Sequence, residues 1–253
     1  MKKRIVAFLL TLAMLVGLVP QVMLSALAEE LTEAYTLEND FIRVSVSKKN
    51  GGFTVATREG DRLKKSDNNK KLLYHDGEYD TSFVTFRVTD AGGETKDYLF
   101  GGKYAGSSEV EVTQAQAGGE IRAVWSVGDL TFTETVALAN AVSNENGMVS
   151  LSLAVENRGT PVKVRARILY DTFLDGSDYG IYQVSDVQSN IETVTTERVL
   201  DGSAYAIPQN FYAVDDPTSI GVAAYSVNPV LPEKVAFGHW NRLAETLYDF
   251  TPV

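Results

Sequence analysis

Apolar and polar residues alternate along much of the chain beyond residue 40. The alternation is clearest at 121–127, 130–138 and 149–156, where nearly every second side chain is apolar. A strand places successive side chains on opposite faces, so this period of two predicts antiparallel strands with one buried face and one face in water. Shorter apolar segments predict further strands at 41–46, 53–57, 83–88, 98–100, 110–112, 162–168, 181–187, 191–200, 211–214, 220–227 and 235–237.

Turn-forming residues separate the predicted strands at intervals typical of hairpins. Examples are Gly51-Gly52, Gly128-Asp129 and the Asn-Arg-Gly-Thr-Pro sequence at 157–161. Strands at this spacing, without long helices between them, predict an all-β fold in the form of a large antiparallel β-sandwich. A short helix is expected at 241–247. No repeat or linker divides the chain, so we expect one sandwich domain over residues 37–253, after a lead-in at 29–36.

The first 28 residues have the organisation of a secretory signal peptide. Cations at 2–4 precede an apolar run at 5–19, and Ala26 and Ala28 supply small residues before Glu29. This pattern predicts export and cleavage after Ala28. The alternative is an uncleaved membrane anchor, but a spanning helix needs about 20 apolar residues, and this run is shorter.

The chain is acidic and has no cysteine. It carries 23 cations and 33 acids, a net charge of −10, and removal of residues 1–28 would leave a net charge of −13 because it takes three cations and no acid. An acidic balance argues against nucleic acid, whose phosphates attract clustered Lys and Arg. The lack of cysteine excludes a disulfide framework, a thiolate metal site and a cysteine nucleophile. Together with the signal peptide it favours a secreted or cell-surface bacterial protein.

Three aspartates, Asp171, Asp175 and Asp178, follow the strand predicted at 162–168. Carboxylate oxygens are the ligands that Ca²⁺ prefers, and a pair of carboxylates can serve as general acid and base. The spacing differs from that of an EF-hand, and Asp and Gly are also residues that a turn uses for its own backbone hydrogen bonds. A Ca²⁺ site and an ordinary turn both stay open, and Ca²⁺ is the one cofactor that the sequence suggests.

A row of cations, Lys163, Arg165 and Arg167, occupies every second position of one predicted strand and therefore shares one of its faces. Such a row could bind an anionic ligand. The alternative is a solvated face paired with acids on neighbouring strands, such as Glu156. Further ligand-binding candidates are the two histidines and one adjacent aromatic residue, although isolated histidines more often have structural roles: His75, His239 and Trp240.

Short catalytic motifs are absent from the sequence. There is no Gly-x-Ser-x-Gly, no Gly-x-x-x-x-Gly-Lys and no His-Glu-x-x-His. These absences remove the easily identified hydrolases and nucleotide-binding proteins. They leave glycosidases and lyases that act through carboxylates, because such enzymes carry no short motif.

Seven short segments, 39–44, 52–55, 67–74, 81–88, 167–172, 237–240 and 248–251, resemble the galactose-mutarotase-like supersandwich modules of large secreted or surface-attached bacterial proteins. The resemblance covers most of residues 37–251 and implies fold and location more than activity, since most such modules have no assigned function. It also implies further strands after Thr251, so we expect this chain to be part of a longer protein. The histidines and glutamate with which mutarotases surround a sugar have no matching motif here and are not transferred.

Two functions follow as hypotheses. The first is a non-catalytic extracellular β-sandwich module of a larger bacterial protein, binding carbohydrate or another cell-surface protein. The second is the β-sandwich part of a secreted carbohydrate-active enzyme, whether a glycoside hydrolase, a lyase or a mutarotase-like protein. A fold alone does not separate them, because function depends on a site.

Overall fold

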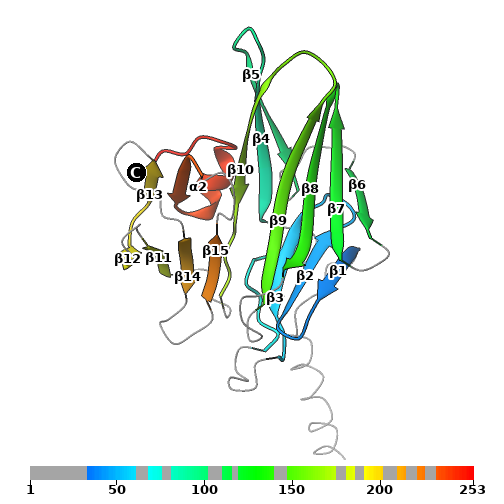
Figure 1. Cartoon of the computed structure of the whole chain (residues 1–253). Coiled ribbons are helices and arrows are strands. Elements are labelled where there is room, and N and C mark those ends of the chain that lie inside the picture. The colour runs from blue at the N-terminus through cyan, green and yellow to red at the C-terminus, as the bar shows by residue number, and fades with distance from the viewer. Residues whose placement is uncertain are drawn as a thin grey trace, which may run out of the picture. The chain divides into compact units, whose positions relative to one another are not determined.

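Antiparallel strands make up nearly all of the regular structure in the computed structural model of the chain (Figure 1). The structure describes residues 33–60, 68–75, 81–101, 110–115, 119–139, 147–174, 181–185, 191–201, 210–214, 221–225 and 232–253. The predicted signal peptide lies outside these residues. The strands of the first half are β1 (Ala34–Glu38), β2 (Ile42–Ser47), β3 (Phe53–Thr57), β4 (Phe83–Thr89), β5 (Thr95–Phe100), β6 (Val110–Gln114), β7 (Glu120–Val127) and β8 (Leu130–Ala139).

The second half adds shorter strands and one helix, α2 (Trp240–Glu245). The strands are β9 (Met148–Asn157), β10 (Lys163–Leu169), β11 (Ile181–Ser185), β12 (Ile191–Val194), β13 (Arg198–Asp201), β14 (Asn210–Val214), β15 (Gly221–Tyr225) and β16 (Lys234–Phe237). In the part of the chain described, no helix is both long and apolar enough to span a membrane.

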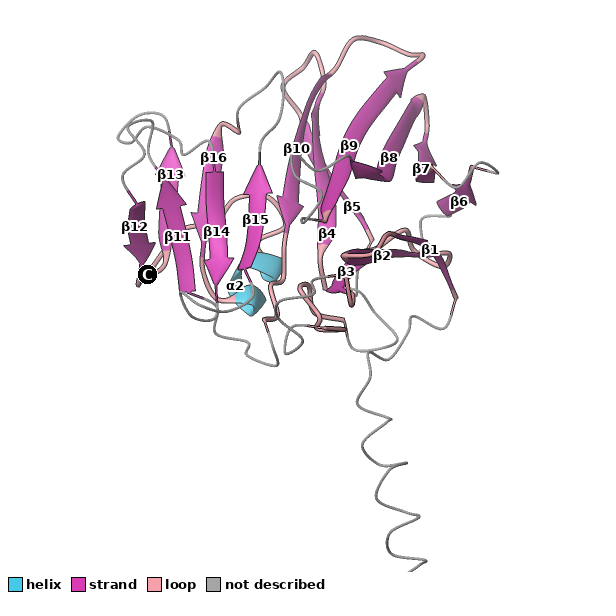
Figure 2. Cartoon of the chain, turned by 60° about the horizontal axis from the view of Figure 1, so that its bottom comes forward, coloured by secondary structure: helices cyan, strands magenta, loops and turns pink. Residues whose placement is uncertain are grey.

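These strands pair into several sheets, and every pairing is antiparallel (Figure 2). The prediction of an all-β, antiparallel fold is therefore confirmed. The sheet orders are β1-β2-β3, β10-β4-β5, β6-β7-β8-β9, β12-β11-β14-β15 and β13-β16.

The largest hydrophobic cluster joins one end of the sheet β6-β7-β8-β9 to the sheet β10-β4-β5. Trp125 and Phe132 from the first sheet contact Phe86 and Phe100 from the second, and all four side chains are buried. The Phe100 and Trp125 rings stack with centroids 4.6 Å apart. Burial of such aromatic rings on facing sheets is the main stabilisation expected for a sheet-on-sheet fold.

The other end of the same four-stranded sheet packs on β1-β2-β3. Ile121 and Val136 contribute from the four-stranded sheet, and Val44, Val46 and Phe53 contribute from the smaller one. The alternation in β2 is as the sequence predicts, with Ile42, Val44 and Val46 buried. One apolar face of β6-β7-β8-β9 thus packs against both smaller sheets, β10-β4-β5 and β1-β2-β3.

The second face of β10-β4-β5 is covered by α2 and the residues near it. Phe83 and Leu169 on the sheet contact Leu243 and Ala244 on the helix, and Trp240 and Phe250 pack around them. β4 is therefore buried on both faces, which explains why its residues Phe83–Phe86 are all buried.

Three details differ from the prediction. β1 begins at Ala34, within the expected lead-in, because its backbone pairs with β2 although only Leu37 is buried. The strand expected at 191–200 is two strands, since β12 pairs with β11 whereas β13 pairs with β16 in another sheet. The expected helix at 241–247 runs instead from Trp240 to Glu245.

Candidate functional site

The cations of β10 lie on the sheet face that carries α2. The antiparallel register places Lys163 opposite Thr89, Arg165 opposite Arg87, and Arg167 opposite Thr85. The shared face predicted for Lys163, Arg165 and Arg167 therefore exists, and β4 extends it with a fourth cation.

Arg87 is the most fully bonded of these cations. Its Nε and Nη2 donate to the two carboxylate oxygens of Asp97 on β5, at 2.7 Å and 2.8 Å, and its Nη1 donates to Asp249 at 2.5 Å. The guanidinium also lies over the Tyr248 ring, 4.1 Å from its centroid. The hydrogen bonds to Asp97 contribute most to raising the pKa of Arg87. Arg87 thus joins β4, β5 and the C-terminal residues.

Arg167 binds the end of the helix. Its Nη2 donates to the Leu243 carbonyl at 2.7 Å and its Nη1 to the Thr246 hydroxyl at 3.4 Å. A cation at the last turn of a helix satisfies carbonyls that have no partner within the helix. Burial lowers the pKa of Arg167, as expected for a guanidinium enclosed between sheet and helix. Arg167 is therefore enclosed between the sheet and α2 and bonded to carbonyl and hydroxyl oxygens, rather than lying on a solvated face paired with acids.

Lys163 and Arg165 are more exposed. Arg165 Nε lies 3.4 Å from a carboxylate oxygen of Glu233, and both side chains are largely in water. Among the described residues Lys163 has no ion pair. These two side chains are the exposed part of the predicted row.

His239 and Trp240 begin α2 and hold it in place. The His239 N–H donates to Glu197 Oε1 at 3.2 Å, and its side chain is exposed and makes no capping bond. The Trp240 indole N–H donates to the Thr81 carbonyl at 3.0 Å. The Thr81 hydroxyl donates in turn to the Tyr74 carbonyl at 2.9 Å. Thr81 therefore links the segments that bear the two histidines.

His75 and Asp171 are buried in a polar region beside the start of β4. The Asp171 N–H donates to the Ser82 hydroxyl at 3.0 Å, and its carbonyl accepts from the Tyr74 N–H at 2.8 Å. Asp171 follows β10 as predicted, whereas Asp175 and Asp178 lie outside the described residues. In the described part of the chain, no three His, Cys, Asp or Glu side chains form a group suited to a metal ion.

A buried glutamate that the sequence analysis missed lies close to this region. Glu134 occupies a core-facing position of β8, between Phe132 and Val136, and is 2% exposed. Its negative charge acts on Tyr170, whose pKa is raised to about 12, chiefly by burial of the phenol. The signal was present in the sequence, because residue 134 is in phase with the apolar positions of its strand.

We expect this environment to make the protein lose stability at alkaline pH. The folded-state pKa of Tyr170 lies above the value of about 10 for a free tyrosine, so its contribution to stability is fully present below pH 10. That contribution is lost between pH 10 and 12, where the unfolded chain releases a proton that the folded chain still holds. Between pH 9 and pH 11.5 the wild type should lose about 2 kcal/mol more unfolding free energy than Tyr170→Phe. Urea denaturation of both proteins at the two pH values measures this difference. Equal losses would show that the phenol is not held in its protonated form by folding.

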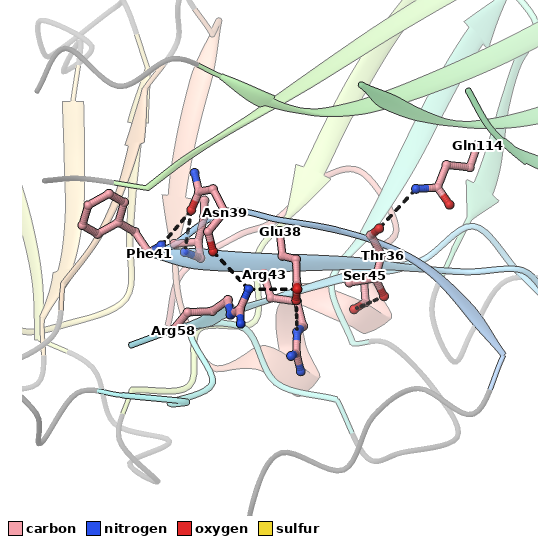
Figure 3. Close-up of polar contacts among 9 residues, drawn as sticks. Thr36, Glu38, Asn39, Phe41, Arg43, Ser45, Arg58 and Gln114 are labelled. Atoms are coloured by element: carbon pink, nitrogen blue, oxygen red, sulfur yellow. Dashed lines mark hydrogen bonds and ion pairs between the residues drawn. The ribbon is translucent and has the colours of Figure 1, made fainter. Parts of the chain in front are cut away.

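A second polar group lies on the exposed side of β1-β2-β3 (Figure 3). Glu38 forms ion pairs with Arg43 at 3.0 Å and Arg58 at 2.9 Å, and Asn39 Oδ1 accepts from the N–H groups of Phe41 and Ile42. The Asn39 contacts define the turn between β1 and β2. Exposed ion pairs of this kind contribute little to stability. Because Glu38 is paired with both arginines, these three charges favour a local role at the edge of the sheet over ligand binding.

Comparisons of the chain with protein-family models, curated proteins and solved structures found no match. The resemblance to galactose-mutarotase-like modules therefore stays a prediction.

Proposed function

We propose that the chain is a non-catalytic, extracellular β-sandwich module of an exported bacterial protein, and that it binds carbohydrate at the cell surface. The signal-peptide pattern supports the location, and the all-β fold suits a binding module. The resemblance to surface modules adds support for both fold and location.

The single observation that carries the proposal is that one face of β10-β4-β5 holds four cations, two bonded to the C-terminal residues and two exposed to water. Arg87 and Arg167 bind the C-terminal residues through carboxylate, carbonyl and hydroxyl oxygens, so their chemistry serves folding. Lys163 and Arg165, on the same face, extend beyond that contact into water. A sheet that presents a few exposed polar side chains is an arrangement suited to binding.

The proposal is tested by expressing the whole chain in a bacterium and following its location and ligands. We expect the protein in the extracellular or cell-surface fraction, with Glu29 at its N-terminus. The purified protein should be retained by at least one bacterial polysaccharide and release no new reducing ends from it. Retention in the cytoplasm would contradict the location, and turnover of the polysaccharide would favour the enzyme hypothesis instead.

A further inference from the structure

Two arginines lie directly opposite each other on the face of β10-β4-β5 that carries α2. Arg165 on β10 and Arg87 on β4 are register partners. Side chains at opposed positions have Cβ atoms about 5 Å apart, and like charges there repel. Such a pair needs negative charge nearby, so the distribution of carboxylates around it shows which arginine can accept a ligand.

The carboxylates are distributed unequally between the two arginines. Arg87 binds Asp97 through two hydrogen bonds and Asp249 through a third. Within the described residues Arg165 has one ion pair, with Glu233, whose 3.4 Å separation exceeds the roughly 2.7–2.9 Å of a charge-assisted hydrogen bond. The Arg165 and Glu233 side chains are 42% and 71% exposed. Glu233 therefore acts as a loosely held internal carboxylate that another carboxylate can replace.

Hydroxyl groups flank this position. Lys163 lies two residues before Arg165 on the same face, about 7 Å along the strand, and Thr89 is its register partner. Thr89 is in turn opposite Thr95 on β5, and their hydroxyl oxygens are 3.2 Å apart. We name the surface formed by Lys163, Arg165, Thr89 and Thr95 the cationic patch. It offers two positive charges beside two exposed hydroxyls.

The charge of the whole protein restricts what this patch can bind. With a net charge of −10, or −13 once residues 1–28 are removed, the molecule repels densely charged polyanions at long range. At physiological ionic strength charges are screened beyond about 8 Å, so the patch attracts an anionic group mainly at close range. A short oligosaccharide with no more than one carboxylate per sugar, surrounded by hydroxyls, fits both conditions.

We propose that the cationic patch binds the carboxylate of an acidic, uronate-type polysaccharide, with Glu233 displaced from Arg165. Arg165 and Lys163 bind the carboxylate, and Thr89 and Thr95 bond to hydroxyls of the sugar. This assignment rests on the carbohydrate binding proposed above and specifies the class of carbohydrate. Because Glu233 competes with the ligand for Arg165, the two residues should have opposite effects on affinity. Removing the Glu233 carboxylate should strengthen uronate binding, whereas removing the Arg165 charge should weaken it.

The test is calorimetric titration of the whole protein with trigalacturonate, a neutral trisaccharide and acetate. We expect the wild type to bind trigalacturonate at least 10-fold more tightly than either of the other two. Arg165→Gln should weaken this binding at least 10-fold, and Glu233→Gln should strengthen it about 3-fold or more. Thermal unfolding checks that each variant folds, which we expect because both side chains are exposed.

Matched substitutions outside the cationic patch distinguish binding at the patch from a general effect of net charge on binding. Glu156 on β9 and Arg158, in the turn that follows β9, form an exposed ion pair outside the patch. Arg158→Gln changes the net charge as Arg165→Gln does, and Glu156→Gln changes it as Glu233→Gln does. We expect Arg158→Gln and Glu156→Gln to bind trigalacturonate like the wild type. Equal effects of Arg158→Gln and Arg165→Gln would overturn the assignment, as would the absence of trigalacturonate binding. Retention by a neutral polysaccharide with no response to Arg165→Gln would overturn the patch while leaving the proposed function standing.

Discussion

Replacing Phe132 by alanine should lower the free energy of unfolding by about 4 kcal/mol, a typical cost for removing a buried aromatic ring. The side chain is fully buried in β8, and its ring centroid lies 4.7 Å from that of Phe86 and 5.0 Å from that of Phe100. Tyr98 adds a third ring at 5.8 Å. The cavity would lie where the two sheets meet, so the surrounding rings cannot close it without moving whole strands. Urea denaturation of the variant and the wild type measures the loss.

The neighbouring residue provides the control. Thr133 follows Phe132 in β8 and points to the opposite face of the sheet, so Thr133→Ala should change the unfolding free energy by less than about 0.5 kcal/mol. A loss below about 1 kcal/mol for Phe132→Ala would contradict the packing of β8 against β4 and β5.

The strands of the first half could be predicted because burial follows the sequence locally. In β8 the positions of Leu130, Phe132 and Val136 are buried as their spacing of two predicts. Turn residues fixed the ends of these strands, as at Gly128, whose backbone adopts a positive φ of 57°. Each of these features depends on a few neighbouring residues and needs no knowledge of distant contacts.

The candidate site could be predicted only in part, because its contacts join distant parts of the chain. The alternation placed Lys163, Arg165 and Arg167 on one face, but it could not show which of them would be enclosed. The sequence does not reveal that Arg167 meets the carbonyl of Leu243, 76 residues later. Arg87 has one near partner, Asp97, and one still more remote, since Asp249 follows it by 162 residues. Such pairs arise from the packing of α2 on the sheet.

At Glu134 the period of the strand and the type of residue predict opposite environments. Its position in β8 is core-facing by period alone, yet its residue type suggests exposure, because carboxylates are rarely buried. Packing decided the outcome, since both neighbouring core positions are fully buried.

The second large effect is expected at Glu197, the residue that anchors the C-terminal part of the chain. Its carboxylate accepts from the His239 N–H and the Val253 N–H, both at 3.2 Å, and forms an ion pair with Arg242. Glu197→Ala removes the acceptor of all three donors, and hydrogen bonds to a charged group are each worth about 1.5–3 kcal/mol. Two of the donors can turn to water, so we expect a loss of about 3 kcal/mol in unfolding free energy, together with faster tryptic cleavage after Arg242.

Two further variants distinguish anchoring from a general effect of charge. Glu192 lies five residues earlier and forms one exposed ion pair with Arg198, so Glu192→Ala should cost less than about 1 kcal/mol and leave cleavage after Arg242 unchanged. Glu197→Gln keeps an acceptor oxygen but loses the charge, and its loss should fall between those of the two alanine variants. If Glu197→Ala and Glu192→Ala proved equally stable, α2 would be held by its apolar contacts with Phe83 and Leu169 and by the hydrogen bonds of Trp240 and Arg167, without a contribution from Glu197.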